Sequence, residues 1–329
     1  MRGFRKLDVR VKREGLRVRT RKGFIGVTDE VLNVPEKPRT GDSQLYVMLV
    51  SPIPATEVPL RLTPIVGQDA KGNSFLRALL HIDTQTIDFA DEANGWKRMT
   101  LDVAGVTLGQ NGRVVNEFTR THTVRIPPNA LAIVQQNGLI YSTDVPVKSP
   151  GAYQFRIVVR DANSRRFGTA GQFIEIPDLK KNVLALSGIV LTEAASDGTP
   201  GLPPAVPVEA AISPVQFTSN PAVRRFRPGA VLSYAHLIYN ARAVASTGKP
   251  QITTQVRLFH DGKEVFTGPE AAFDPGQQKD AARLSNDGVV RLTPTAAAGD
   301  YSLQIIVKDH AAGKTPRVAT QWIDFEVVE

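Results

Sequence analysis

The 329-residue sequence contains no cysteine. This absence excludes disulfide bonds, thiolate nucleophiles and cysteine-ligated metal sites, and it leaves the redox compartment undetermined. Long apolar runs are also missing, since no stretch approaches the ~18 apolar residues that a bilayer span requires. The basic N-terminus, beginning at Met1, is not followed by the apolar segment of a secretory signal. The chain itself is therefore predicted to carry neither a membrane span nor an export signal.

Recognisable catalytic and metal-binding motifs are absent as well. The five histidines are too far apart in the sequence for a local metal site. They are His81, His122, His236, His260 and His310. No nucleophile elbow, P-loop, dinucleotide fingerprint or calcium loop occurs. The acids Asp88, Asp91 and Glu92 lie in a turn-like stretch without a matched partner. We therefore expect no enzymatic activity, no cofactor and no bound metal.

The net charge of +8 is concentrated at one end of the chain. Residues 1–23 carry ten Lys and Arg against two acids, and the remaining residues carry 30 of each sign. Apolar residues alternate with charged ones over 7–11 and 16–18, around a turn at Glu14-Gly15, so residues 1–30 are predicted to contain a basic β-hairpin. A solvated basic face is favoured over a nucleic-acid site here, because such clusters commonly have no specific partner.

The body of the chain is a succession of short strand-like runs separated by Gly, Pro, Asn and Asp clusters. This pattern, without alternating long helices, indicates antiparallel β-sandwiches. In the first half the predicted strands are 44–50, 58–66, 75–82, 98–106, 113–126, 139–147, 153–159 and 172–176. One short helix is predicted at 128–138, where Pro and Asn open the segment and Gly closes it.

A second module follows a boundary at 177–181. The proline- and glycine-rich stretch 196–207 is expected to be an extended loop. The remaining predicted strands are 184–191, 224–226, 231–239, 252–259, 265–266, 289–292, 301–307 and 321–328. The predicted fold is therefore all-β, with two tandem immunoglobulin-like or fibronectin type III-like sandwiches at 31–180 and 181–329 preceded by the hairpin.

Two stretches repeat one pattern, Gly151–Asp161 and Gly299–Asp309. Each has a Gly two residues before a Tyr, then alternating apolar residues, then a basic residue and an Asp. We interpret each stretch as the penultimate strand of a sandwich. Tyr153 and Tyr301 lie where a tyrosine corner fixes the preceding crossover connection, so both are expected to be structural rather than catalytic.

The two tryptophans are the candidate contact residues. In the last strand Ile323, Phe325 and Val327 share one face, which places Trp322 on the other. Trp96 follows a predicted turn. An outward-facing tryptophan can bind a sugar or a protein, and a loop or the neighbouring module covers such a ring about as often.

The basic N-terminal segment resembles part of a known family. Residues 4–13, followed by 16–24, are similar to the closing segment of von Willebrand factor A (VWFA)-related proteins of acidobacterial type, with Phe24 in the place of a Tyr. The Pro-Gly-Ala-Tyr stretch at 150–153 and the Leu-Ala-Leu-Ser-Gly stretch at 184–188 are similar to the C-terminal region of the same proteins. The resemblance implies the C-terminal part of a longer exported protein, located extracellularly or in the periplasm. The adhesion-site motif Asp-x-Ser-x-Ser has no counterpart here, so no metal-binding residue is implied.

Three functions remain open from the sequence. The first is a non-enzymatic, secreted module of stalk or adhesion type that binds a protein or a cell-surface polymer. The second is carbohydrate or cell-wall recognition through Trp96 and Trp322. The third is nucleic-acid binding by the basic hairpin, which the balanced charge of the remaining chain disfavours.

Overall fold

The computed structural model describes residues 3–6, 23–26, 41–68, 72–110, 112–147, 149–194, 211–214, 219–278, 280–313 and 315–329. Contacts divide the chain into two units, Met1–Gln44 and Leu45–Glu329. In the first unit β1 (Gly3–Lys6) and β2 (Gly23–Gly26) pair antiparallel. The predicted hairpin turn at Glu14-Gly15 and the predicted loop at 196–207 lie outside the described residues.

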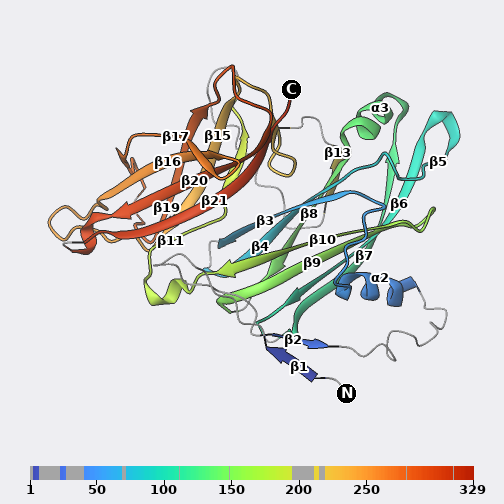
Figure 1. The fold of residues 1–329 in the computed structure, drawn as a ribbon, viewed down its shortest axis with the longest axis horizontal. Helices are drawn as coiled ribbons and strands as arrows, with labels where there is room; N and C mark the ends of the chain where they lie inside the picture. The colour runs from blue at the N-terminus through green and yellow to red at the C-terminus, as the bar shows by residue number, and fades with distance from the viewer. Residues whose placement is uncertain are drawn as a thin grey trace. The chain divides into compact units, whose positions relative to one another are not determined.

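The second unit is built almost entirely of β-strands (Figure 1), which confirms the predicted all-β class. Its first sandwich has two facing sheets. One sheet contains β3 (Leu60–Gln68), β4 (Ser74–Ile82), β8 (Leu139–Pro146) and β13 (Ala211–Pro214). The other contains β5 (Ala90–Asp91), β6 (Lys97–Leu108), β7 (Val114–Ile126), β9 (Gly151–Asp161) and β10 (Phe167–Ile176).

The second sandwich repeats this arrangement. One sheet contains β11 (Ala185–Leu186), β12 (Val190–Glu193), β15 (Val231–Tyr239) and β19 (Arg283–Arg291). The other contains β14 (Arg225–Phe226), β16 (Ile252–His260), β17 (Lys263–Thr267), β18 (Ala271–Ala272), β20 (Gly299–Asp309) and β21 (Arg317–Val327). Short 3-10 helices occur at Ala93–Gly95, Leu179–Lys181 and His310–Ala312.

Both sandwiches share one connectivity. In the first, β3, β4 and β8 are neighbours in one sheet, while β7, β6, β9 and β10 are neighbours in the other. In the second, β12, β15 and β19 correspond to the first set, and β17, β16, β20 and β21 to the second. This order is compatible with the Greek-key connectivity of immunoglobulin-like sandwiches, with β7 and β17 as the extra strands beside β6 and β16.

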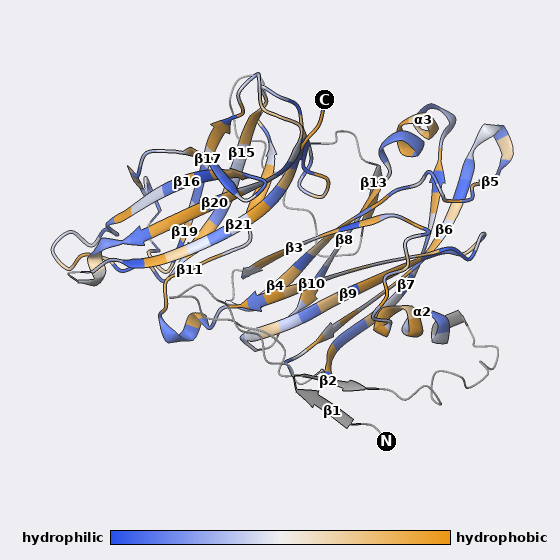
Figure 2. Ribbon diagram, in the orientation of Figure 1, coloured by the Kyte–Doolittle hydropathy of each residue, from blue (hydrophilic) through white to orange (hydrophobic). Residues whose placement is uncertain are grey.

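Each sandwich has its own apolar core, and hydrophobic residues alternate with polar ones along the strands of both (Figure 2). The first core runs from Val58 to Ile176 in the sequence, and the second runs from Leu184 to Val327. Alternation is the pattern of a sheet with one face on the core and one toward water. The core therefore changes between Ile176 and Leu184, at the place where the composition indicates a boundary.

The prediction of a strand at 44–50 is wrong, because this segment forms the helix α2 (Gly41–Val50). Leu45 and Leu49, four residues apart, are buried against Ala104 and Val158 on the outer face of the sheet that contains β6 and β9. A short apolar run fits a strand or a helix equally well by periodicity. Packing against an exposed apolar sheet face decided the outcome. The helix predicted at 128–138 is confirmed as α3 (Pro128–Asn137).

Strand β13 departs from the predicted division of the chain. It lies in the range assigned to the second module, yet it pairs antiparallel with β8 of the first sandwich, with Ile212 opposite Tyr141. Ile212 packs against the first core. The chain therefore adds a strand to the first sandwich after it has begun the second one, which a sequential division at residue 180 does not foresee.

The repeated stretch forms β9 and β20, which have the same length and the same order of buried and exposed residues. Gly151 and Gly299 have φ values of 145° and 140°, a backbone region that favours glycine. The Tyr153 hydroxyl donates to the Ser149 carbonyl at 2.6 Å. The Tyr301 hydroxyl donates to the carbonyl four residues upstream in the same way, at 3.0 Å. This is the geometry expected of a tyrosine corner.

The aspartate that ends each repeat has a role that the sequence did not indicate. Asp161 and Asp309 are both fully buried. One carboxylate oxygen of each accepts from the backbone N–H two residues downstream, at 3.0 Å in both sandwiches. The other oxygen accepts a backbone N–H from a loop between the two sheets. In the first sandwich the donor is Asp88, after β4, at 2.9 Å, and in the second it is Arg242, after β15, at 3.0 Å. The repeated strand thus anchors a crossover loop at each of its ends.

Candidate functional site

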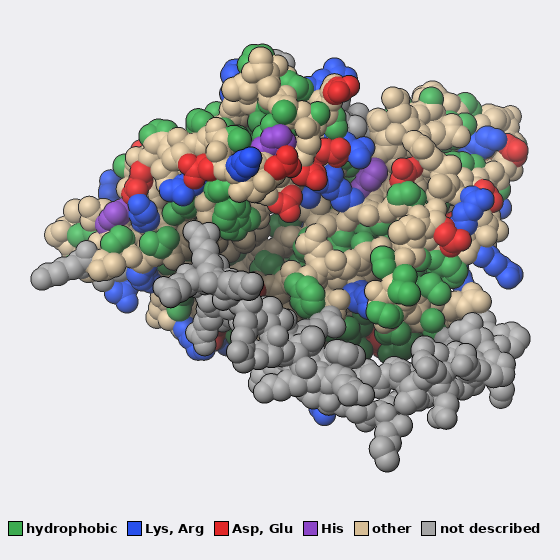
Figure 3. Space-filling model, viewed as in Figure 1, with side chains coloured by type: hydrophobic (Ala, Val, Ile, Leu, Met, Phe, Trp, Pro, Cys, Tyr) green, Lys and Arg blue, Asp and Glu red, His purple; other side chains and the backbone are tan. Residues whose placement is uncertain are grey.

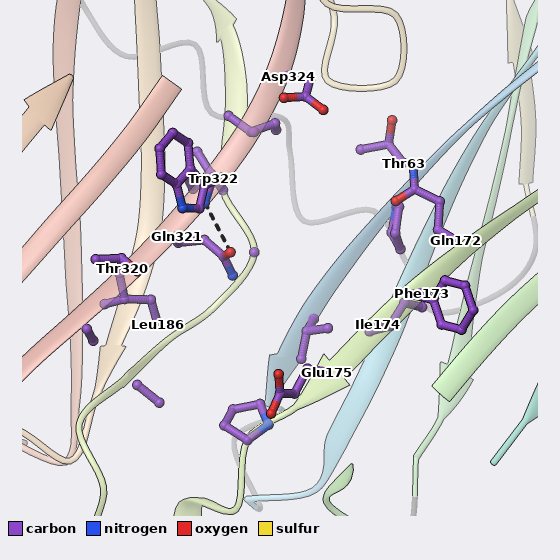
Figure 4. A pocket seen from close by; sticks show the side chains of 18 of the residues that line it. Thr63, Gln172, Phe173, Ile174, Glu175, Leu186, Thr320, Gln321, Trp322 and Asp324 are labelled. Atoms are coloured by element: carbon purple, nitrogen blue, oxygen red, sulfur yellow. Dashed lines mark hydrogen bonds between the residues drawn. The ribbon is translucent and has the colours of Figure 1, made fainter. Parts of the chain in front are cut away.

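A cleft of about 510 Å³ lies between the two sandwiches. Residues of β3 and β10 form one wall, and residues of β21 with the segment around β11 form the other (Figure 4). β3, β10 and β11 are the outermost strands of their sheets, and β21 is outermost except where β14 pairs with it. The sandwiches therefore meet edge to edge. Hydrophobic side chains lie on both sides of the hollow, and acidic and basic side chains gather at one end of it (Figure 3).

Two sets of contacts close the cleft at its ends. At one end the Gly188 N–H donates to the Val66 carbonyl at 2.9 Å. At the other end Arg61 of β3 lies 3.8 Å from the Glu326 carboxylate of β21, which Arg225 also binds at 2.8 Å. The cleft is therefore a defined gap between two points of attachment.

Arg224 is the most unusual side chain of the cleft wall. It is 6% exposed and has a φ of 52°. Its guanidinium donates to the Asp324 carbonyl at 2.6 Å, to the Pro221 carbonyl at 2.7 Å and to the Thr63 hydroxyl of the first sandwich. Burial, with a smaller contribution from the charge of Arg61, lowers the pKa of Arg224 to about 10. A buried cation that binds both sandwiches fixes their orientation at this end of the cleft.

Trp322 lies where the alternation of the last strand predicts. Phe325 and Val327 are buried, while Trp322 is 47% exposed. Its ring lies over the outer face of its own sheet, with its centroid 5.1 Å from that of Phe259. Figure 4 shows the indole at the cleft wall, above Gln321. The indole thus contacts Phe259 and leaves about half of its surface exposed.

Phe173 is the counterpart of Trp322 on the opposite wall, and it was missed in the sequence. It is 69% exposed, whereas Ile174 and Ile176 of the same strand are buried. The two aromatic rings flank the cleft without meeting across it (Figure 4). The alternation along β10 is the signal that identifies Phe173, because Ile174 and Ile176 share the buried face.

Trp96 lies elsewhere and does not join this site. It follows the 3-10 turn before β6 in the first sandwich and is half-buried. The Arg125 guanidinium lies 5.2 Å from its ring centroid, and Glu92 binds Arg125 at 2.6 Å. A cation held over the ring by a carboxylate covers part of the surface that a sugar would need. The two candidate tryptophans therefore do not form one platform.

The described residues also bear on nucleic-acid binding, metal binding and membrane insertion. Of the ten basic residues of the N-terminal segment, the described ranges contain Arg5 and Lys6. Across the described ranges, no three His, Asp or Glu side chains are grouped as a metal site requires. Within that same part of the chain, no helix has the length and apolarity to cross a membrane.

Close approach at Gly188 gives a testable consequence for the cleft. A Cβ atom at this position would lie 3.0 Å from the Ile65 Cα and 3.1 Å from the Val66 nitrogen. We expect Gly188→Val to lower the free energy of unfolding by about 1–3 kcal/mol, measured by urea denaturation. Ala271→Val, at an exposed position of β18, is the matched control. A stability equal to that of the control would contradict a tight contact at this end of the cleft.

No protein-family model matches the sequence, and no curated protein matches it either. Solved structures align at low superposition scores. A Corynebacterium diphtheriae protein assigned as membrane anchored is 12% identical with a TM-score of 0.22, over 82% of this chain and 59% of that one. Trypsin-activated alpha-2-macroglobulin from Escherichia coli is 12% identical with a TM-score of 0.23, over 84% and 17%. The C-terminal domain of the Streptococcus pyogenes antigen I/II-family protein AspA is 10% identical with a TM-score of 0.21, over 82% and 99%. The chain thus spans less than two thirds of the length of the first two proteins.

Proposed function

We propose that this chain is a non-enzymatic interaction module of an exported protein, and that the cleft between its sandwiches is the contact surface. The observation that supports this function is the pair of exposed aromatic residues, Trp322 and Phe173, on opposite walls of the cleft. Aromatic residues that border a concave surface are typical anchors of binding sites. Two sandwiches joined at two ends of the cleft hold these anchors at a set separation.

The setting that we propose for the module is the C-terminal region of a VWFA-related protein outside the cytoplasm. This part of the proposal rests on the resemblance of residues 4–24. The genomic sequence directly upstream of Met1 tests it. An in-frame VWFA-type domain with a signal peptide is the expected result, and a ribosome-binding site at that place would contradict it.

The contact surface itself can be tested by photo-crosslinking in cells of the source organism. We expect Phe173→p-benzoylphenylalanine to crosslink a partner, and Trp322→Ala in the same chain to reduce the yield at least tenfold because it removes an anchor worth more than ~1.4 kcal/mol. The control is Phe266→p-benzoylphenylalanine, at an exposed position of β17 outside the cleft lining. Equal crosslinking from both positions, or a yield indifferent to Trp322→Ala, would overturn this assignment.

Carbohydrate binding is the second candidate function, because the supported and half-exposed indole of Trp322 is suited to stacking on a sugar. Glycan-array binding that disappears in Trp322→Ala would favour it. Binding that persists in both Trp322→Ala and Trp96→Ala would exclude it.

A further inference from the structure

The cleft wall formed by β21 has a backbone edge that is open over part of its length. In the described part of the chain, β20 pairs with one side of β21 along the whole strand, and β14 pairs with the other side only at Glu326 and Val327. The N–H groups of Glu326 and Val328 point away from β20 and donate to the carbonyls of Arg224 and Phe226, at 3.0 and 2.9 Å. These bonds define which residues of β21 face the cleft side.

Backbone groups alternate sides along a strand, so the N–H and C=O of Thr320 and Trp322 point to the same side as those of Glu326. The Asp324 carbonyl confirms this direction, since it accepts the Arg224 Nε at 2.6 Å on that side. Among the described residues, the Trp322 N–H donates to the side-chain oxygen of the adjacent Gln321, at 3.1 Å (Figure 4). A flexible side chain that occupies an edge N–H is readily displaced by a strand.

We propose that an extended segment of a partner polypeptide pairs with the edge of β21 at Thr320 and Trp322, as an added strand within the cleft. This inference rests on the proposed function, because it assigns the mode of binding at the same surface. The position that the segment would occupy continues that of β14, which already pairs with this edge. Donors and acceptors that repeat every second residue recognise a main chain, which a sugar does not offer.

The side chains around this edge indicate the composition of the segment. Glu175 and Asp324 line the cleft together with the buried Arg224, so the charged lining carries an excess of one negative charge. A lysine or arginine in the incoming strand complements this excess. Thr320 and Trp322 project on the exposed face of the sheet, where an aromatic or β-branched side chain of the segment would pack against the indole.

A displayed library of random twelve-residue peptides provides the probe. Peptides are selected on the full chain, and their affinities are then measured for four proteins: the unaltered chain, Thr320→Pro, Thr320→Ala and Trp322→Ala. Proline removes the N–H that points into the cleft, and an edge position whose N–H faces away from the neighbouring strand tolerates it. Thermal unfolding of each variant reports whether the fold is retained.

We expect Thr320→Pro to weaken the selected peptides at least tenfold while Thr320→Ala changes their affinity less than twofold. Methylation of alternate backbone amides in the peptide, which leaves its side chains intact, is expected to abolish binding. Peptides that lose affinity in Trp322→Ala but tolerate Thr320→Pro and amide methylation would overturn strand pairing and leave the cleft as a binding site. Peptides indifferent to all three substitutions would overturn both proposals. A library without any enriched peptide would overturn strand pairing alone, since an open edge accepts many sequences.

Discussion

Asp309→Ala is expected to lower the free energy of unfolding of the second sandwich by about 3–5 kcal/mol. The carboxylate is fully buried and binds the backbone N–H groups of Arg242 and Ala311. It also forms an ion pair with Arg317, whose guanidinium would keep its charge but lose its carboxylate partner. Removing one member of such a buried network leaves the remaining groups desolvated without compensation.

The equivalent substitution in the first sandwich, Asp161→Ala, removes the bonds from the Asp88 N–H, the Asn163 N–H and the Ser164 hydroxyl. We expect a loss of about 2–4 kcal/mol, somewhat smaller than for Asp309→Ala because, among the described residues, no cation pairs with the Asp161 carboxylate. Urea denaturation measures both variants, with the exposed Asp300→Ala as the control that should change stability by less than about 0.5 kcal/mol. Losses no larger than that of the control would show that the two aspartates do not anchor the crossover loops.

Acidification is expected to destabilise the second sandwich through His236. This side chain is 3% exposed in the core, opposite Asn286 of the neighbouring strand, and within the described residues its Nδ1 has no hydrogen-bond partner. Burial lowers the pKa of His236 from 6.5 to about 4. The folded protein therefore keeps the imidazole neutral at a pH at which the unfolded chain protonates it.

The direction of the effect follows from proton binding in the two states. Above pH 6.5 both states are neutral, so His236 contributes no pH dependence. As the pH falls from 6.5 to about 4, the unfolded state takes up a proton first and the free energy of unfolding decreases. A pKa difference of about 2.5 corresponds to a loss of about 3 kcal/mol. Below about pH 4 the folded state also binds the proton and the loss levels off.

Denaturation curves at pH 7.5 and pH 4.5, for the unaltered chain and for His236→Gln, measure this contribution. The burial of His81 and His122 also lowers the pKa of each, so a smaller dependence of the same sign remains in the variant. The decisive quantity is the difference between the two proteins at each pH. A difference that does not change between pH 7.5 and 4.5 would contradict a neutral buried His236.

Local patterns accounted for most of the strands and for one of the two α-helices in the described part of the chain. The period-two alternation of β9 and β20 places Phe155 and Leu303 in the cores, and the same alternation in β21 exposes Trp322. These outcomes follow from nearest-neighbour geometry, because successive side chains of a strand point to opposite faces. The strand prediction for 44–50 was wrong because Leu45 and Leu49 fit both the strand period and the helix period. Only packing against the surface of β6 and β9 selected the helix.

The candidate site, in contrast, could not be predicted from local sequence patterns. The cleft brings together Thr63, Phe173, Arg224 and Trp322, which are separated by up to 259 residues in the chain, from Thr63 to Trp322. No periodicity relates them, because each lies at an edge of a different strand or loop. Their proximity depends on how two separately cored sandwiches meet, through the Gly188 N–H and the Arg224 guanidinium.

The sequence by itself determined that the chain is all-β, that one strand pattern occurs twice, and that Tyr153 and Tyr301 begin those strands. These properties are local, and alternation and turn chemistry encode them within about ten residues. Only the tertiary structure decided that Asp161 and Asp309 anchor crossover loops, that β13 joins the first sandwich, and that the edge of β21 faces a cleft. Those properties depend on contacts between residues distant in sequence, whose hydrogen bonds and packing form only once the sheets are assembled.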